Sequence, residues 1–490
     1  MMKSAGKNMN SRKIYVGLVL LFLLAALMFS RHIDPEKKRS QQHLTYNTDV
    51  EDTSLSIEAD SFSTHLPIVS IETGGQVIPG RPEEGQHVRS IVNTYIQADM
   101  KIYDAAGVLN TLSAEPDIDS QINIRVRGNS SRLFDKVGYL FQFTKDDGSD
   151  RDIAVMGMEK DNTWVLHGPF LDKTLIRNYM WYNLSGRIMD WAPDVRFCEV
   201  FLNQEYQGVY VMTEQISVGE GRIEVTKYDG KAGVSSYIVC ADRESVNDVQ
   251  YLQNFTSYAR RIYGRLEVKY PGASKLTPEL TETISRDFSK FEKALYSYDY
   301  DSARYGYQNY IDVDSFVDYF IINEVAQNTD AGLYSTYFYK DVTGKLKMCV
   351  WDFNNCCDNY MEEQTPMAGF FMQSRPWYFM LCKDENFNKR IISRYRELRR
   401  GILSEEAITA NIREIRDYLG TAVDRNFEKW GYSFLPENDL LSDDYRKIGS
   451  YEEAMEQYET RLIRHMRWMD EHIEDLLSYS HESKNKKFNH

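Results

Sequence analysis

The sequence lacks the short motifs that most often mark zinc sites. It contains no C-x-x-C and no H-E-x-x-H, and its nine histidines are scattered along the chain. Zinc sites usually draw cysteine or histidine ligands from such short spacings. We therefore do not expect a zinc site.

Clustered positive charge is also scarce. The main body has no long stripe rich in lysine or arginine, and 73 acidic residues against 58 basic ones give a formal net charge of -15. Nucleic-acid-binding proteins need clustered cations to neutralise the phosphate backbone. The charge pattern therefore argues against nucleic acid as a partner.

An uncharged apolar run near the N-terminus extends from Ile14 to Ser30 and follows several basic residues. At about 1.5 Å per helical residue this run spans roughly 25 Å, enough for a thin bilayer. With the positive charges on the inner side, we expect residues 1–30 to form a short cytoplasmic tail and a transmembrane signal-anchor. A cleaved signal peptide is the alternative, although no clear A-x-A site follows the run. Both interpretations place the main domain outside the cytoplasm, either held at the cell membrane by one helix or secreted.

The chain has six cysteines, which are compatible with disulfide bonds in that location. Their pairing does not follow from the sequence. The adjacent Cys356 and Cys357 are more typical of buried thiols than of a redox centre. The six residues are Cys198, Cys240, Cys349, Cys356, Cys357 and Cys382.

The chain of 490 residues is long enough for one large core with appendages or for two domains, and 42% of all its residues are hydrophobic. Strand patterns dominate from Leu66 to about Lys145, and helical patterns follow Trp164. We therefore predict an α+β fold with a β-rich N-terminal part and a helical C-terminal part. The expected organisation is a polar stalk at residues 31–65, a core at 66–385, a helical subdomain at 386–477 and a polar tail at 478–490.

One segment predicts a β-hairpin with an aspartate at each end. Tyr334–Lys340 and Leu346–Trp351 are rich in aromatic and β-branched residues, and a Thr-Gly turn signal lies between them. Folding the second strand back on the first brings Asp330 close to Asp352. Two carboxylates at one end of a hairpin suit Mg²⁺ or another hard divalent cation. The alternative is that both aspartates only cap turns.

The residues before Asp352 favour the metal interpretation. Asp352 directly follows the apolar sequence Cys349-Val350-Trp351, which places its carboxylate at the mouth of a buried strand. A charge in such a place needs an ionic partner or a metal ion.

A second segment has the composition of a phosphate-binding turn. Arg127-Gly128-Asn129-Ser130-Ser131-Arg132 lies between two predicted strands and supplies a glycine, small hydroxyls and flanking cations. Lys136 could reach a phosphate from the same edge. A simple connecting loop and a solvated lysine are the alternatives.

Two further positions could face the same ligand. Lys173 and Arg177 fall one turn apart on a predicted helix that Asp172 could cap, although such pairs are common on helix surfaces. Glu214 closes the outgoing strand of a second predicted hairpin. It is either a rim charge or an acid that orients a lysine or a nucleotide group.

These segments together resemble one family. The motifs R-G-N-S-S, D-K-V-G-Y, L-D-K-T-L-I-R-N, Y-Q-G-V-Y-V-M-T-E, N-T-D and V-W-D-F-N occur in this order. The chain resembles the CotH kinase family, named for a spore-coat protein, from about Leu66 to about Asp470. The resemblance implies an atypical protein-kinase-like fold that binds ATP and a divalent metal ion, Mg²⁺ or Mn²⁺, and phosphorylates Ser or Thr.

The resemblance also implies roles for single residues. Asp352 resembles the metal-binding Asp of a D-F-D-type motif, and Asp330 resembles the catalytic or second metal-site Asp. Lys136 would bind a phosphate and Glu214 would face the nucleotide. Arg127, Lys173 and Arg177 are further candidates for phosphate contacts.

The chain departs from the family pattern at two places. Asn354 stands where a second metal-binding Asp is common, and Ser335-Thr336 stand where an Asn commonly follows the catalytic Asp. The lost charge could weaken a second metal site. An active enzyme and a pseudokinase that still binds nucleotide both fit this pattern.

The first functional hypothesis is therefore a membrane-anchored extracytoplasmic kinase that transfers the γ-phosphoryl group of ATP to Ser or Thr hydroxyls of surface proteins. The second is a scaffolding surface protein whose kinase-like core only binds nucleotide or a partner. Glycoside hydrolysis by the paired carboxylates is a third. The sequence does not predict the oligomeric state.

Overall fold

The computed structural model describes most of the chain after residue 39. The described residues are 40–45, 50–244, 249–258, 265–361, 364–438, 440–441 and 446–486. The predicted anchor at residues 1–30 lies outside them, as do residues 31–39 and 46–49 of the predicted stalk. The chain divides into two units, Met1–Gln41 and Gln42–His490, and all the strands and helices named here belong to the second.

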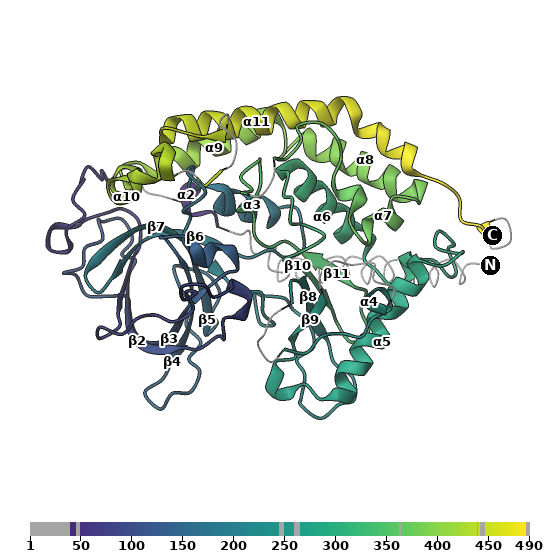
Figure 1. Ribbon diagram of the computed structural model, residues 1–490, viewed down its shortest axis with the longest axis horizontal. Helices are drawn as coiled ribbons and strands as arrows, with labels where there is room; N and C mark the ends of the chain where they lie inside the picture. Colours follow the sequence, from purple (N-terminus) through teal and green to yellow (C-terminus); the bar gives the residue numbers. More distant parts are fainter. Residues whose placement is uncertain are drawn as a thin grey trace, which may run out of the picture. The chain divides into compact units, whose positions relative to one another are not determined.

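A closed seven-stranded barrel forms the first part of this unit (Figure 1). Its strands in spatial order are β1 (Ile68–Glu72), β2 (Ile96–Tyr103), β3 (Ile118–Arg127), β4 (Gly138–Thr144), β5 (Thr163–His167), β7 (Glu205–Glu214) and β6 (Val195–Leu202). Neighbouring strands are antiparallel except for β1 and β6, which close the barrel in parallel. In β3, Ile122, Ile124 and Val126 are buried in alternation with more exposed polar residues. This period of two lets every strand fill the interior with apolar side chains.

A second sheet of four strands follows, in the order β11 (Lys347–Cys349), β10 (Thr336–Lys340), β8 (Tyr237–Asp242) and β9 (Arg265–Tyr270). Strands β10 and β11 pair antiparallel with Tyr337 opposite Cys349. The predicted hairpin is thus confirmed, although its second strand is shorter than predicted.

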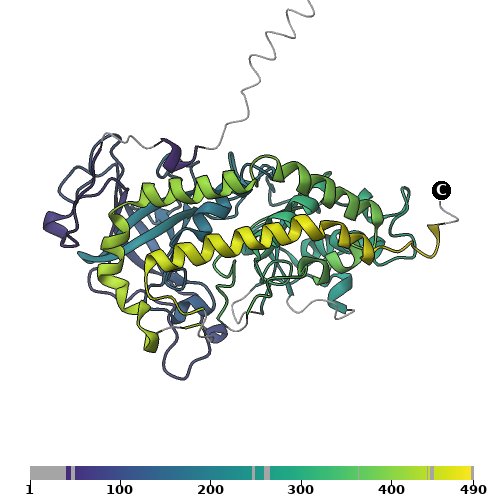
Figure 2. The ribbon, with the colours of Figure 1, turned by 90° about the horizontal axis from the view of Figure 1, so that it is seen from above.

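The helices cover this sheet and one side of the barrel (Figure 1). They are α2 (Gln42–Thr45), α3 (Arg177–Ser185), α4 (Phe255–Tyr258), α5 (Pro278–Leu295), α6 (Val313–Ala326), α7 (Tyr378–Leu381), α8 (Glu385–Arg399), α9 (Glu405–Leu419), α10 (Ala422–Trp430) and α11 (Tyr451–His472). Figure 2 shows α11 running alongside α9. The observed strands and helices confirm the predicted α+β class.

Side-chain caps fix where the longer helices begin. In each case a hydroxyl or carboxylate accepts a hydrogen bond from a backbone N–H of the first turn, which has no partner within the helix. The caps are Thr277 for α5, Asp312 for α6, Asp384 for α8, Ser404 for α9 and Ser450 for α11. Helix α6 is buried on nearly all sides and ends at Ala326, with Gln327 as its C-cap just before the loop that carries Asp330.

The folded part begins earlier than the sequence pattern indicates. Phe62, in the segment predicted as stalk, is buried against Phe201 with ring centroids 4.8 Å apart. Asp52 lies 3.0 Å from the guanidinium of Arg425 in α10. The pattern misses these residues because their contacts are with the barrel and a helix far along the chain.

All six cysteines are described, buried and free, so none forms a disulfide bond. Within the described part of the chain, no helix is both long and apolar enough to cross a membrane.

Arg425 is the centre of a buried ionic network. Its guanidinium donates hydrogen bonds to both carboxylate oxygens of Glu199, at 2.9 and 2.7 Å, as well as to Asp52.

Arg425→Met would leave two buried carboxylates without their cation. We expect it to lower the free energy of unfolding by about 3–5 kcal/mol in a urea titration.

Arg390→Met is the matched control, because Arg390 pairs with Asp314 on the surface and both side chains are more than half exposed. We expect a loss below about 1 kcal/mol there. Equal losses in the two variants would contradict the importance of the network.

Candidate active site

The loop after α6 is tied directly to the segment after β11. The side-chain amide of Asn328 donates a hydrogen bond to the backbone carbonyl of Asp352, at 2.9 Å. A second bond, 3.0 Å long, joins the same amide to Asn323 within α6. The two segments that carry the candidate aspartates are therefore held side by side.

Helix α3 fixes the other side of Asp352. The backbone N–H of Asp352 donates to the hydroxyl of Tyr182 at 2.9 Å, and that of Phe353 donates to the side chain of Asn178 at 2.7 Å. Asp352 has a φ of +61°, which a non-glycine residue rarely adopts. These bonds hold it in that conformation, and such strain is typical of functional sites.

The two carboxylates come together as the hairpin predicts. Burial raises the pKa of Asp330, Arg243 opposes this rise, and the charge of Asp352 adds to it. A side-chain hydrogen bond of 2.8 Å from Asn355, three residues beyond Asp352, reaches Asp330. The Asp330 and Asp352 side chains therefore belong to one cluster.

Each aspartate faces an arginine. Burial raises the pKa of Asp352, and Arg127 opposes this rise. Arg243 lies 3.6 Å from the carboxylate of Asp330 and opposes the rise of its pKa. Burial thus disfavours the charged form of both carboxylates, and nearby cations stabilise it.

Asp242 and Arg243 are site residues that the sequence analysis does not predict. Strand β8 runs antiparallel to β10 with Ala241 opposite Thr336, so the residues that end β8 lie at the edge where β10 begins. Asp330 lies just before that edge. The sequence does contain a signal for Asp242. This residue follows the apolar residues 237–241, just as Asp352 follows Cys349-Val350-Trp351.

The side-chain oxygen atoms at this edge suit Mg²⁺ or a similar hard cation, which needs only a few ligands from the protein. No group of three or more His, Cys, Asp or Glu that could hold a metal occurs in the described ranges. A metal ion here would therefore depend on Asp352 and Asp330, helped by the amide oxygen of Asn354. Mg²⁺ commonly binds one or two carboxylates and takes its other ligands from water and phosphate.

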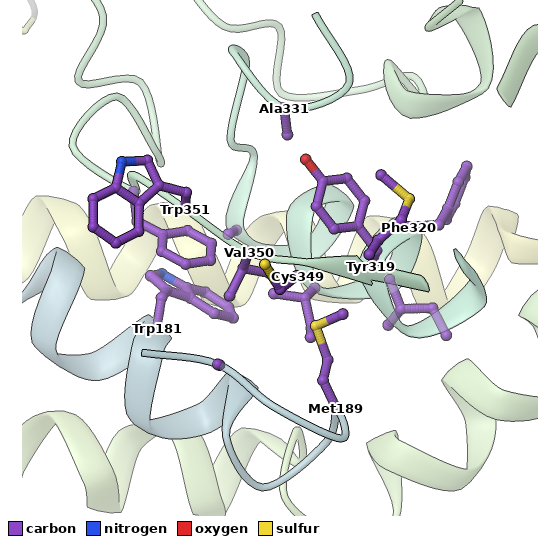
Figure 3. Packing of buried hydrophobic residues seen from close by; sticks show 14 of the residues in the cluster. Trp181, Met189, Tyr319, Phe320, Ala331, Cys349, Val350 and Trp351 are labelled. Carbon is purple, nitrogen blue, oxygen red and sulfur yellow. The ribbon is translucent and has the colours of Figure 1, made fainter. Parts of the chain in front are cut away.

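Beside Asp352 lies a small pocket of about 10 Å³ between the barrel and α3. Its walls come from β3, β5, β7, α3 and the segment after β11. The lining residues are Arg127, Val165, His167, Asn178, Tyr182, Thr213, Trp351 and Asp352. Figure 3 shows how Cys349, Val350 and Trp351 pack among apolar residues that include Trp181 of α3 and Tyr319 of α6. The pocket therefore combines a cation, a carboxylate and apolar walls.

Comparison with known families identifies the same family that the sequence motifs resemble. Residues 124–479, well over half of the chain, match the family described as CotH kinase protein. The chain belongs to the CotH kinase family. No curated protein matches it in a separate search. Membership of a kinase family generally implies the use of ATP and a divalent metal ion.

Of the residues predicted to bind phosphate, Arg127 lines the pocket of this member of the CotH kinase family. It is the last residue of β3, and its guanidinium lies 5.7 Å from the centroid of the Trp351 ring. Its charge also acts on Asp352. Arg127 is therefore well placed for an anionic ligand next to a metal ion.

Lys136 requires a correction, because it does not line this pocket. Its Nζ donates hydrogen bonds of 2.6 Å to the carbonyl of Val209 and to the side chain of Asn426 in α10. Burial lowers the pKa of Lys136 well below its usual value. This lysine joins the barrel to α10 in the structure.

Lys173 and Arg177 also lie away from the pocket. Lys173 stacks over Phe434, 5.3 Å from the ring centroid. Arg177 is buried, pairs with Asp172, and donates a 3.1 Å hydrogen bond to the carbonyl of Cys356. Arg177 therefore supports the segment after Asp352, which is a structural contribution to the site.

Glu214 points away from the pocket for a geometric reason. Successive residues of a strand face opposite sides, and its neighbour Thr213 lines the pocket. The carboxylate of Glu214 accepts a 2.9 Å hydrogen bond from the N–H of Asp194 and lies 3.5 Å from Arg222.

Asn354 lies in the cluster and is held on both sides. Its side-chain oxygen accepts a 2.9 Å hydrogen bond from Asn178, and its N–H donates to the carboxylate of Asp352 at 3.2 Å. One lone pair of this oxygen is thus already engaged, which makes Asn354 a weaker metal ligand than an aspartate.

Glu324 lies near the end of α6, the helix that leads into the loop with Asp330. Its burial should make the stability of the protein depend on pH. Burial raises the pKa of Glu324 from 4.5 to about 8, although the N–H groups of Phe371 and Met372 bind its carboxylate. Since protonation favours the folded state, stability should fall as the pH rises from about 4.5 to about 8. Glu324→Gln removes this dependence.

We expect the stability difference between Glu324→Gln and the wild type to move in favour of the variant over this range, by up to about 1.4 kcal/mol for each unit of pKa change. Urea titrations at several pH values measure it. The exposed Glu456→Gln in α11 is the control. A difference that stays constant with pH would contradict the buried acid.

Proposed function

We propose that this chain is a metal-dependent protein kinase that transfers the γ-phosphoryl group of ATP to Ser or Thr hydroxyls. The observation that carries the proposal is the convergence of Asp330 and Asp352, held by Asn328, beside the pocket that Arg127 lines. Phosphoryl transfer depends on positioning and charge neutralisation more than on covalent chemistry. The cluster offers these two things, and family membership supports the same reaction class.

Each residue has a distinct task in this proposal. Asp352 holds the metal ion, which when bound neutralises charge on the phosphates. Arg127 binds the phosphate chain from the barrel side. Asp330, whose pKa burial raises, accepts the proton of the substrate hydroxyl or completes the metal site.

The proposed substrate and location rest on the N-terminal sequence. The basic N-terminus and the apolar run Ile14–Ser30 support a membrane-anchored kinase that acts on surface proteins outside the cytoplasm. The same residues support a secreted enzyme if the run is cleaved.

A nucleotide-binding pseudokinase is the second candidate, and Asn354 favours it, because its amide oxygen already accepts a hydrogen bond from Asn178 and is a weaker metal ligand than an aspartate. The pocket beside Asp352 has a cavity volume of about 10 Å³, far below the roughly 300 Å³ at which pockets for drug-sized ligands begin. Trp351 forms one wall and lies close to Tyr337, with ring centroids 6.0 Å apart. ATP would therefore need Trp351 or its neighbours to move. Glycoside hydrolysis has less support, because an arginine faces the carboxylate pair.

Transfer of label from γ-labelled ATP to protein, with Mg²⁺ or Mn²⁺ present, tests the proposal on the full chain. We expect Asp352→Asn and Asp330→Asn each to lower transfer at least about a hundredfold, since each removes charge that the reaction needs. Asp352→Asn should also abolish metal-dependent ATP binding. Asp314→Asn, an exposed aspartate of α6, is the control and should leave transfer unchanged.

The outcomes separate the two candidates. Metal-dependent ATP binding without transfer in the wild type would support the pseudokinase. Absence of both would rule out the nucleotide proposal, and transfer that survives Asp352→Asn would refute the assigned metal site.

A further inference from the structure

His167 is a buried polar side chain that the assigned roles do not use. It is the last residue of β5, is 8% exposed, and lines the pocket beside Asp352. Its Nε2 atom is buried and has no hydrogen-bond partner among the described residues. A buried imidazole nitrogen in this state costs about 1–3 kcal/mol, so a ligand that supplies a partner would recover this energy.

The charges around His167 favour an anionic ligand. The pKa of His167 is lowered to about 3, mainly by burial and also by the charges of Arg127 and Lys136, while Asp172 opposes this effect. The imidazole is therefore neutral near pH 7 and carries one N–H to donate. It lies within electrostatic reach of Arg127, in the same pocket as the carboxylate proposed to hold the metal.

We propose that His167 is a nucleotide-binding residue that donates a hydrogen bond from Nε2 to a phosphate oxygen of ATP. This inference rests on the proposed function and assigns one more residue to its site. The phosphate chain is favoured over the base, because Arg127 and Asp352 line the same pocket and both bind the phosphate end of a metal–nucleotide complex.

The position of Lys136 supports this assignment. The family resemblance assigns phosphate binding to Lys136, but its Nζ bonds to Val209 and Asn426 instead. His167 faces the pocket that Lys136 does not line. No motif marks it, because a histidine that ends an apolar strand looks like an ordinary core residue in the sequence.

Binding of three ligands by the full chain in the presence of Mg²⁺ tests the inference. The ligands are ATP, adenosine and inorganic tripolyphosphate, measured by isothermal titration calorimetry. We expect His167→Leu to weaken ATP and tripolyphosphate at least about tenfold and to leave adenosine unchanged. His167→Gln, whose amide reaches the position of Nε2, should retain most of the affinity.

His43→Leu is the matched control. His43 is another imidazole whose pKa burial lowers, to about 4, but it bonds to the hydroxyl of Tyr179 at 2.9 Å and does not line the pocket. Its substitution should leave the affinity for all three ligands unchanged. Circular dichroism reports whether each variant is folded.

The outcomes distinguish this inference from the function on which it rests. If the wild type binds no ATP, the proposed function fails. If it binds ATP and folded His167→Leu binds ATP equally well, or loses affinity for adenosine to the same extent as for ATP, only the inference fails.

Should His167→Leu not fold, the comparison of His167→Gln with His167→Asn decides, because the shorter amide cannot reach the position of Nε2. Equal ATP affinity in these two variants would overturn the inference.

Discussion

The hydrogen bond from the side chain of Asn328 to the carbonyl of Asp352 joins the two halves of the candidate site. One half is the loop after α6, and the other is the segment after β11. The β10–β11 hairpin brings these segments near each other, but a hairpin alone does not fix where its flanking residues point. Because Asn328 is anchored to Asn323 as well, the end of the buried helix sets the position of Asp352.

Helix α3 connects this arrangement to the barrel. Tyr182 and Asn178 bind the backbone of Asp352 and Phe353, and Arg177 binds the carbonyl of Cys356. Strands β3, β5 and β7 supply the other walls of the pocket. The candidate site is therefore assembled from two sheets and the helix between them, which explains why the carboxylates are buried and their pKa values raised.

Local patterns in the sequence predict the features that depend on short stretches of chain. The hairpin follows from two strand-like segments around a Thr-Gly turn, and the proximity of Asp330 and Asp352 follows from the hairpin. Each of these features is decided by residues close together in the chain.

The remaining features depend on packing between distant segments. The side chain of Lys136 runs to α10, 290 residues away in sequence. Which face of β7 meets the pocket, and hence that Glu214 points away from it, depends on how the barrel closes. Asp242 and Arg243 reach the site only because β8 lies beside β10. Asp52 and Phe62 look like stalk in the sequence because their partners lie in the barrel and α10.

The most direct measurement is a crystal structure of the full chain with Mn²⁺ and a non-hydrolysable ATP analogue, with the metal located by its anomalous scattering. The account predicts a single strong peak bonded to a carboxylate oxygen of Asp352, with Asp330 beside it and the terminal phosphates between the metal and Arg127. A metal bound by neither aspartate, or a nucleotide outside the pocket that Arg127 and Asp352 line, would contradict it.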